Sequence, residues 1–316
     1  MAFNSASGYN NLPSGNFTPE IFSQKVLKFF RRASVAEDIT NTDYAGEIEN
    51  FGDTVRIIKE PTITVSSYSR GSVVNPQDLA DDQTTMVVDQ ANAFAFKIDD
   101  IEERQSHVNF EALATSSGEY ALKLKYDGNI LSAMFDGAGI SSEASPTTAQ
   151  VTGLGTLGTA LSGQTGDNLV NLMLKMARAL DDQSVPEENR WFVAAPAFYE
   201  TLFGAGAKFA EVQVTGDGTS PLRNGLVMAG NIAGFNRYKT TAFNAAGTDT
   251  VDVTGLGAGE FPILAGHISS TATASHIAKP EVVRSTETFS DIVRGLHVFG
   301  RKVLRPEALV RGVISL

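Results

Sequence analysis

The chain contains 316 residues, carries a formal net charge of −11 and has no cysteine. Apolar residues make up 42% and charged residues 19%, a balance typical of a folded protein that buries a sizeable core in one large or two closely packed domains. This composition excludes disulfides and thiolate chemistry, and the acidic balance argues against a nucleic-acid reader, because phosphate binding requires a dense basic surface.

Two further features concern location. No stretch approaches the roughly 18 consecutive apolar residues of a membrane span, and the polar start lacks the basic and apolar regions of an export signal. The absence of cysteine also fits a protein made in a reducing cytosol. The sequence therefore predicts a soluble protein with no membrane partner.

Charge is unevenly distributed along the chain. Residues 1–36 carry four basic side chains against one acidic, and 279–316 carry seven against four, whereas 51–104 carry five basic against ten acidic. The basic ends can pair with the acidic early segment, within one chain or between chains. Ordinary solvated charge explains the same pattern equally well.

The N-terminal stretch 1–17 is polar and aperiodic and is expected to be a flexible arm. Thr18 and Pro19 then supply a cap and a first-turn proline, and apolar residues follow at helical spacing. This pattern predicts an amphipathic helix over 19–35 with a basic opposite side. Its aromatic stripe packs either into the core of its own chain or against another subunit.

Two β-rich stretches follow, and they predict a long hairpin. Residues 54–67 are β-branched and are interrupted at Pro61, and 84–98 place apolar side chains at alternate positions. The arms would reach on the order of 45 Å at about 3.3 Å per residue. An isolated two-stranded ribbon is marginally stable in water, so either the same domain or a neighbouring copy must cover it, and its length favours the neighbour.

Residues 109–136 contain no proline and predict one long helix of roughly 42 Å, at about 1.5 Å per residue, that ends at Gly137. The residues expected on its apolar face are Phe110, Leu113, Ser117, Tyr120, Leu124, Leu131 and Phe135.

The second half of the chain mixes the two kinds of element. Residues 137–167 are expected to be loop with weak strand content, followed by a helix over 168–182. The later elements are expected as a strand over 190–195, a helix over 196–203, short strands within 224–243, a pair of strands within 251–266, and a strand-rich basic tail from 297. The fold class is therefore α+β.

The sequence offers little evidence for catalysis, so the chain is not expected to be an enzyme. The stretch GLGTLG at 153–158 matches a dinucleotide-binding spacing, but the strand before it is weak and no acidic residue follows at the required distance. A glycine turn with positive φ and no ligand is the preferred interpretation. Its first residues belong to VTGLG at 151–155, which recurs at 253–257, and five residues are too few to indicate a duplication. The four histidines show no metal-site spacing, so no catalytic residue, cofactor or metal is predicted.

The order of elements, together with several local strings, resembles the major capsid proteins of tailed bacteriophages (Caudoviricetes), which have the Hong Kong 97 fold, and most of all those of short-tailed phages (podoviruses). The resemblance spans nearly the whole chain. It is carried by the strings at 22–40, 52–57, 97–131, 189–202, 222–243 and 300–310, including FSQKVLKFFRRASVAEDIT, NRWFVAAPAFYETL and GRKVLRPEALV.

The resemblance implies a division of the chain into parts. These are an N-terminal arm with its helix (1–50), an extended β-hairpin loop (51–98), a peripheral domain (99–164) with a spine helix (109–136), an axial domain (165–270) and a return to the peripheral domain (271–316). It also implies a function, namely self-assembly into the icosahedral head shell of a virion that encloses packaged double-stranded DNA without sequence-specific binding.

The implied partners are further copies of the chain in pentamers and hexamers, a separate scaffolding protein, a portal protein and, in some relatives, a decoration protein. Assembly would take place in the cytoplasm of a host bacterium. Some family members crosslink their shells through a lysine in the extended loop, but residues 61–96 contain no lysine, so a non-covalent shell is expected.

Contacts between subunits are expected from charged residues. Asp78, Asp81 and Asp82, interpreted as lying near the tip of the extended loop, are expected to meet basic groups of another subunit, and Arg70 is a further loop candidate. The basic candidates are Lys25, Lys28, Arg31, Arg32, Arg301, Lys302 and Arg305.

Three other interpretations stay open at this point. An encapsulin, a bacterial nanocompartment of the same fold, would enclose an enzyme instead of a genome. A nucleotide-dependent enzyme would use Gly153 to Gly158, and a tail or decoration protein would form fibres or trimers.

Overall fold

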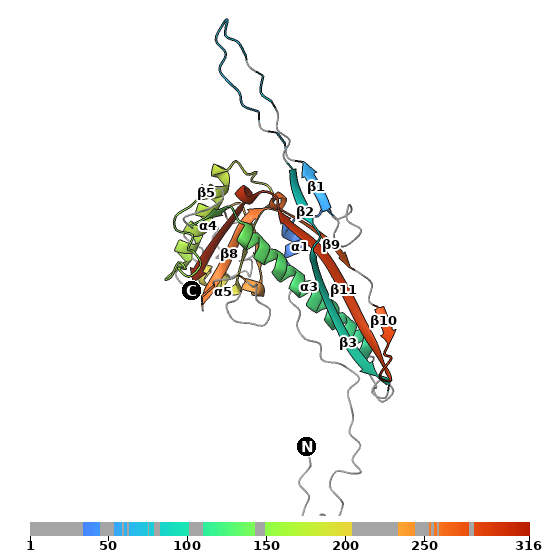
Figure 1. Ribbon diagram of the computed structural model, residues 1–316. Coiled ribbons are helices and arrows are strands. Elements are labelled where there is room, and N and C mark those ends of the chain that lie inside the picture. The colour runs from blue at the N-terminus through green and yellow to red at the C-terminus, as the bar shows by residue number, and fades with distance from the viewer. Residues whose placement is uncertain are drawn as a thin grey trace, which may run out of the picture.

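The computed structural model describes residues 34–44, 54–58, 60–61, 63–74, 76–78, 83–100, 110–142, 149–203, 233–243, 253, 256–257, 259–277 and 281–316 (Figure 1). The α-helices are α1 (Ala36–Ile39), α3 (Phe110–Gly137), α4 (Gly166–Asp182) and α5 (Pro196–Leu202), with short 3-10 turns at Thr241–Phe243, Ile268–Ser270 and Pro306–Ala308. The strands are β1 (Thr54–Ile58), β2 (Gln83–Val87), β3 (Gln90–Asp99), β4 (Ile140–Ser141), β5 (Ala149–Gln150), β6 (Arg190–Ala194), β7 (Asn236–Lys239), β8 (Glu260–His267), β9 (Thr271–Ile277), β10 (Glu281–Arg284), β11 (Ser290–Val303) and β12 (Leu309–Ser315).

The described strands form three sheets. A six-stranded sheet has the order β5-β4-β12-β8-β6-β7, and an elongated sheet has the order β10-β11-β3 with β9 pairing along another part of β11. The third is the β1-β2 pair, which carries the projecting hairpin. Because β11 and β12 enter different sheets, the C-terminal segment ties the two larger sheets together.

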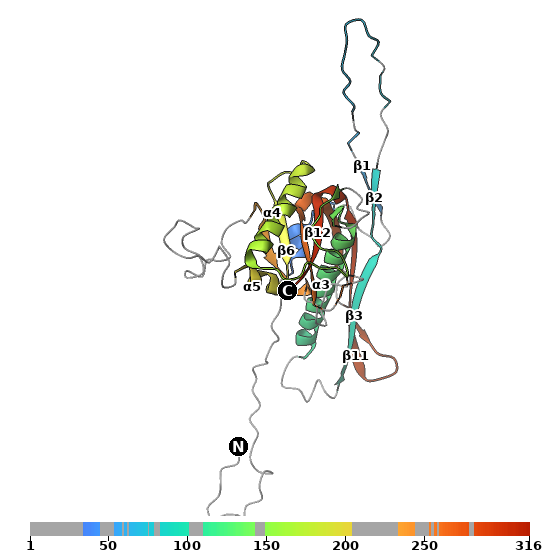
Figure 2. The same cartoon turned by 90° about the vertical axis from the view of Figure 1, so that its left-hand side faces the viewer.

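The layers are visible in Figure 2, where α4 and α5 lie on one side of the six-stranded sheet and α3 on the other, with β3 and β11 beyond α3. The alternation of side chains along β6 produces this arrangement. Trp191 and Val193 face the core that contains α3, whereas Phe192 and Ala194 face the core under α4 and α5. A strand buried on both faces is expected to be mostly apolar, and all five residues of β6 are buried. Its four residues after Arg190 are apolar, and Arg190 itself donates hydrogen bonds to backbone carbonyls.

The long helix confirms the sequence prediction almost residue for residue, because it spans Phe110–Gly137 against an expected 109–136. Its expected apolar face is only partly right. Leu131 and Phe135 are buried, but Ser117 is exposed. The reason is that only the C-terminal part of α3 is enclosed, with the six-stranded sheet on one side and β11 on the other. The side chains of Phe110 and Leu113 lie outside the description.

The other elements divide into confirmed and untested ones. The predicted helix over 168–182, strand over 190–195 and helix over 196–203 are confirmed as α4, β6 and α5. Within 251–266 the structure shows one strand, β8, and the described residues before Gly259 are not in a strand. The predicted helix over 19–35 lies outside the described residues apart from its last two positions, and residues 204–232 lie outside them entirely. The mixed α+β class is confirmed.

Candidate functional site

The hairpin is anchored at its base and projects away from the rest of the molecule (Figure 1). Strands β1 and β2 pair antiparallel from Thr54 opposite Val87 to Ile58 opposite Gln83. Val55, Met86 and Val88 turn inward and form a small core with apolar side chains of β9 and β11. The predicted alternation in 84–98 is confirmed, because more buried and more exposed positions alternate along β2 and β3. At the base of the hairpin the apolar face of β2 packs on the body of its own chain.

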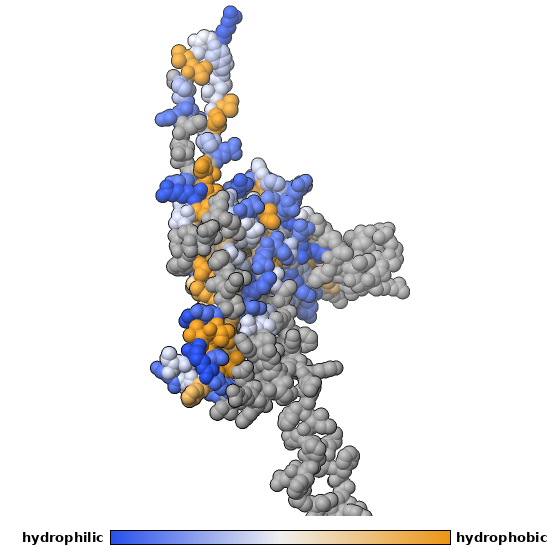
Figure 3. All heavy atoms as spheres, turned by 90° about the vertical axis from the view of Figure 1, so that its right-hand side faces the viewer, coloured by the Kyte–Doolittle hydropathy of each residue, from blue (hydrophilic) through white to orange (hydrophobic). Residues whose placement is uncertain are grey.

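Beyond this base the two arms lose strand pairing. None of the described residues between Ile58 and Gln83 belongs to a strand, although the backbone N–H of Thr64 on one arm donates to Oε1 of Gln77 on the other (2.9 Å). Apolar side chains nevertheless continue along both arms. Val65 is 92% exposed and Val73 is 85% exposed, and Figure 3 shows apolar side chains along the hairpin. Such an arm lacks the burial that would stabilise it within its own chain.

The tip is a tight turn at Ser69–Ser72, where the backbone N–H of Ser72 donates to the carbonyl of Ser69 (2.9 Å). Gly71 has φ +89°, which fits the third position of a type II turn and favours glycine. Arg70 is therefore the residue presented at the end of the hairpin. The expectation that Asp78 lies near the tip is wrong, because the glycine turn places the tip at Arg70 and Asp78 lies five residues before β2. Asp81 and Asp82 lie outside the described residues.

The basic candidates differ in their hydrogen bonding and exposure within the subunit. Arg301 donates from Nη1 to the carbonyl of Asn129 in α3, and burial lowers the pKa of its guanidinium, against the opposing effect of Asp89 and Asp136. Lys302 and Arg305 are exposed at the end of β11 and just after it. Lys25, Lys28, Arg31 and Arg32 lie outside the described residues.

Those candidate acidic and basic residues that the structure describes do not pair with one another within one chain. Within the described residues, Arg70 and Asp78 form no ion pair with Arg301, Lys302 or Arg305, and both are exposed. Their role between subunits remains a prediction.

Sequence reasoning missed Asp127, which fastens the segment before the hairpin to α3. This fully buried carboxylate accepts hydrogen bonds at Oδ1 from the backbone N–H groups of Val35 (2.9 Å) and Ala36 (2.8 Å) and from Oγ of Ser34 (3.1 Å). It satisfies the first N–H groups of α1, whose N-cap residue Val35 has no side-chain acceptor. The sequence could have indicated a buried carboxylate here, because Asp127 lies four residues before Leu131 and therefore on the apolar side of the predicted helix.

The GLGTLG stretch is a structural turn, as predicted. Gly153, Gly155 and Gly158 all have positive φ, at +84°, +74° and +74°. A Cβ at Gly155 would lie 1.9 Å from the carbonyl oxygen of Val313 in β12, so glycine is required there for close approach as well. The stretch leads to a helix only at Gly166, so it lacks the strand-turn-helix context of a dinucleotide fingerprint.

The GLGTLG stretch and the second VTGLG copy meet at one carboxylate. Oε2 of Glu260 accepts hydrogen bonds from the backbone N–H groups of Gly257 (2.8 Å) and Gly158 (3.4 Å). Glu260 thus links the described parts of the two stretches through their backbone N–H groups.

Two searches of the described residues gave negative results. They contain no group of three or more His, Cys, Asp or Glu side chains arranged to hold a metal ion. Among the helices described, none has the length and apolarity needed to cross a membrane.

The overall fold is shared with chains of solved phage structures. A chain from Mycobacterium phage Che8 is 25% identical, with a TM-score of 0.73, over 94% of this chain and 97% of that one. A chain from the capsid of cyanophage P-SCSP1u is 18% identical, with a TM-score of 0.68, over 98% of both chains. A chain from the mature capsid of bacteriophage PhiM1 is 16% identical, with a TM-score of 0.68, over 95% and 92%.

No protein-family model and no curated protein sequence matches the chain. The similarity to phage proteins therefore rests on the comparison of three-dimensional structures. Since the structural matches cover 94% to 98% of this chain, it has, over nearly its whole length, the α+β fold of chains in solved phage structures, which include capsids.

Proposed function

We propose that this chain is the major capsid protein of a tailed phage, with the Hong Kong 97 fold, and that it self-assembles into an icosahedral head shell around packaged double-stranded DNA. The observation that carries the proposal is the match, over nearly the full length of both partners, to chains of solved phage capsids. The projecting hairpin supports it independently, because its apolar arms require a surface that its own chain does not offer among the described residues.

In this proposal the hairpin lies across a neighbouring subunit. Burying a valine side chain completely contributes roughly 1.5 to 3 kcal/mol, and Ile63, Val65, Val73 and Val74 are all largely exposed in the single chain. The neighbour also supplies hydrogen-bond partners for backbone groups of the arms. Assembly therefore stabilises the hairpin and the shell at the same time.

Charge pairing across subunits adds specificity to this contact. Asp78, Asp81 and Asp82 on the returning arm meet basic groups of a neighbour, with Lys25, Lys28, Arg31 and Arg32 of its arm or Lys302 and Arg305 as the partners. Arg301 is a weaker candidate, because its guanidinium already contacts α3. Arg70 at the tip reaches furthest from the body and meets acidic groups.

The shell contacts its genome without strong binding. A net charge of −11 disfavours tight association with DNA phosphates, which suits a cargo that is packed densely and must later leave. The further parts of the proposal are a short-tailed phage, pentamers and hexamers of this chain, a scaffolding protein and a portal as partners, and assembly in the bacterial cytoplasm.

The test is expression of the chain with and without a scaffolding protein, followed by sedimentation and negative-stain microscopy. Closed shells of megadalton mass are expected. A monomer or small oligomer under both conditions would contradict the proposal. The contents of particles from infected cells then separate a genome shell, which holds DNA, from a nanocompartment, which holds an enzyme.

A further inference from the structure

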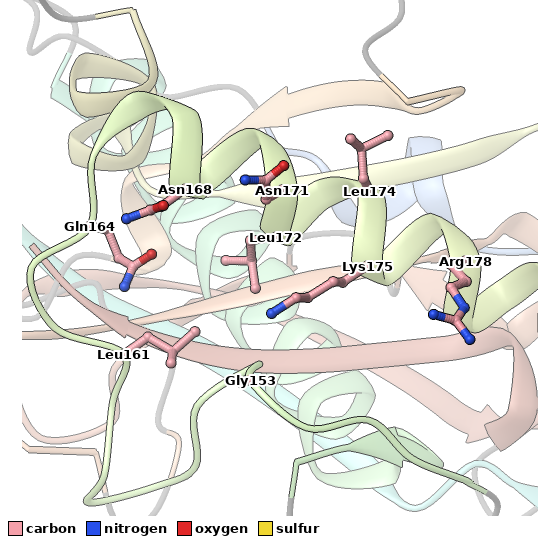
Figure 4. A pocket seen from close by; sticks show the side chains of 9 residues that line it. All are labelled: Gly153, Leu161, Gln164, Asn168, Asn171, Leu172, Leu174, Lys175 and Arg178. Atoms are coloured by element: carbon pink, nitrogen blue, oxygen red, sulfur yellow. The ribbon is translucent and has the colours of Figure 1, made fainter. Parts of the chain in front are cut away.

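A groove with basic side chains runs along α4, on the side of that helix which faces the loop 151–164 (Figure 4). Its volume is about 530 Å³, and a neighbouring hollow of about 310 Å³ shares Lys175 and Arg178 with it. We call this surface the α4 groove and define it by Gln164, Asn168, Asn171, Lys175 and Arg178.

The α4 groove offers hydrogen-bond donors of two kinds. Three carboxamides line its first part, and Lys175 extends from α4 toward the Gly153 turn, where a Cβ on that glycine would lie 2.9 Å from Nζ. Lys175 has no ion-pair or hydrogen-bond partner in the described part of the chain. Arg178 has only a solvent-exposed pair with Asp182, at 3.7 Å, which leaves most of its donors available. The groove therefore suits an acidic peptide segment.

A preorganised acidic segment directly follows the same helix. The turn at residues 183–189, which we call the acidic turn, presents Glu187 and Glu188 to solvent. Ser184, near its start, and Asn189, at its end, have φ of +56° and +57°, a left-handed conformation that is uncommon for residues other than glycine and asparagine. Other groups also hold the turn in this conformation.

The side chain of Arg190 is one such group. It is almost fully buried and donates to the carbonyls of Val185 (2.5 Å) and Pro186 (2.8 Å), while it pairs with Asp181 (2.7 Å). His267 adds a contact to the backbone of Glu188. The acidic turn is thus rigid, and the carboxylates of Glu187 and Glu188 have no partner among the described residues.

We infer that the acidic turn of one copy docks in the α4 groove of the next copy. The inference rests on the proposed function. Glu187 and Glu188 accept hydrogen bonds from Lys175 and Arg178, and the carboxamides bind the backbone of the turn. Because two different surfaces of the same body meet, the contact is head-to-tail and generates rings when the rotation closes. A rigid turn and a rigid helix lose little freedom on docking, which favours this occupant over an unstructured acidic peptide.

The test is a charge swap with four proteins. One variant carries Lys175→Glu and Arg178→Glu, a second carries Glu187→Lys and Glu188→Arg, and the third carries all four changes and keeps the wild-type net charge. Thermal unfolding of the unassembled subunits should be unchanged, since all four side chains are exposed. Sedimentation should show at least about a tenfold loss of shells in each half-swapped variant and recovery in the fourfold variant.

Two outcomes overturn the inference and leave the proposed function standing. In the first, both half-swapped variants assemble like the wild type. In the second, both half-swapped variants fail to assemble and the fourfold variant fails as well, which would show that the two pairs of residues do not contact each other between copies. Failure of the wild-type chain to form shells under any condition would instead contradict the proposed function.

Discussion

The backbone N–H of Ala36 donates to Oδ1 of Asp127 across 2.8 Å, although the two residues are ninety-one positions apart in the chain. This contact holds the segment that precedes the hairpin against the long helix. Lys123 and Glu37 form an exposed ion pair beside it (3.0 Å). The helix α3 therefore supports both large sheets and also fixes the point from which the N-terminal residues depart.

Replacement of Asp127 tests that anchor. Asp127→Ala removes three hydrogen bonds to a charged acceptor and is expected to lower the free energy of unfolding by at least about 1.5 to 3 kcal/mol. Asp127→Asn is the matched control, because its carbonyl oxygen still accepts from the backbone, and it should lose less. Chemical denaturation measures both, and equal losses in the two variants would contradict this account.

The glycine turn at 153–158 gives a second prediction with a built-in control. Gly155→Ala combines positive φ with a collision against the Val313 carbonyl and should cost roughly 2 to 5 kcal/mol. Gly158→Ala has the same φ, but its Cβ meets no atom within 4 Å, so only about 1 to 2 kcal/mol of strain is expected. If both variants have the same melting temperature, the close approach of Gly155 to β12 does not contribute to the stability of the protein.

A third prediction concerns pH. His297 is 5% exposed between the rings of Tyr126 and Phe299, and burial lowers its pKa, partly opposed by Glu37. The imidazole of His297 therefore binds a proton more weakly in the folded protein than in the unfolded chain. The contribution of His297 to the free energy of unfolding is therefore fully present above the unfolded pKa of about 6.5. It is lost as the pH drops toward the lower folded pKa.

His297→Phe removes the titrating group and keeps the aromatic contacts. Its free energy of unfolding should change less than that of the wild type between about pH 7.5 and about pH 5.5. Burial also lowers the pKa of His267, so some pH dependence should persist in the variant. An unchanged pH dependence would show that His297 does not contribute.

The exposed apolar arms of the hairpin give a fourth prediction. Val65→Asp should leave the melting temperature of the unassembled subunit unchanged, because the side chain is 92% exposed, yet it should reduce the yield of shells at least about tenfold. Val65→Ile keeps an apolar surface and should assemble. Normal assembly of Val65→Asp would argue that this arm is not buried between subunits.

A fifth prediction concerns covalent linkage. Residues 61–96 contain no lysine, and Lys97 lies on β3, outside the projecting part of the hairpin. Mature particles should therefore dissociate into a single band of about 34 kDa in a denaturing gel. Ladders of linked subunits would show that other residues crosslink the shell.

Local patterns in the sequence were sufficient for the long helices and for the buried strand β6, but not for the extent of the strands at 54–67 and 251–266. The long helix was predictable because residues 110–137 contain no proline, and the strand at 190–194 because its run is short and apolar. Asp78 was misplaced along the hairpin because the glycine turn at Gly71 was not recognised as the tip.

Long-range pairing was not predictable from local patterns. Periodicity does not indicate that β12 lies between β4 and β8, or that β11 pairs with β3 over ten positions, because those choices depend on partners far away in the chain. The role of Asp127 was missed for the same reason. Its partners lie more than ninety positions away, and only its place on an apolar helix face hinted at them.

A cryo-electron microscopy reconstruction of the particles formed by this chain tests the central claim most directly. The account predicts a closed icosahedral shell in which residues 60–78 of each subunit lie across a neighbour, with Val65 and Val73 buried against it. A closed shell in which this hairpin contacts only its own subunit, or the absence of any closed shell, would contradict it.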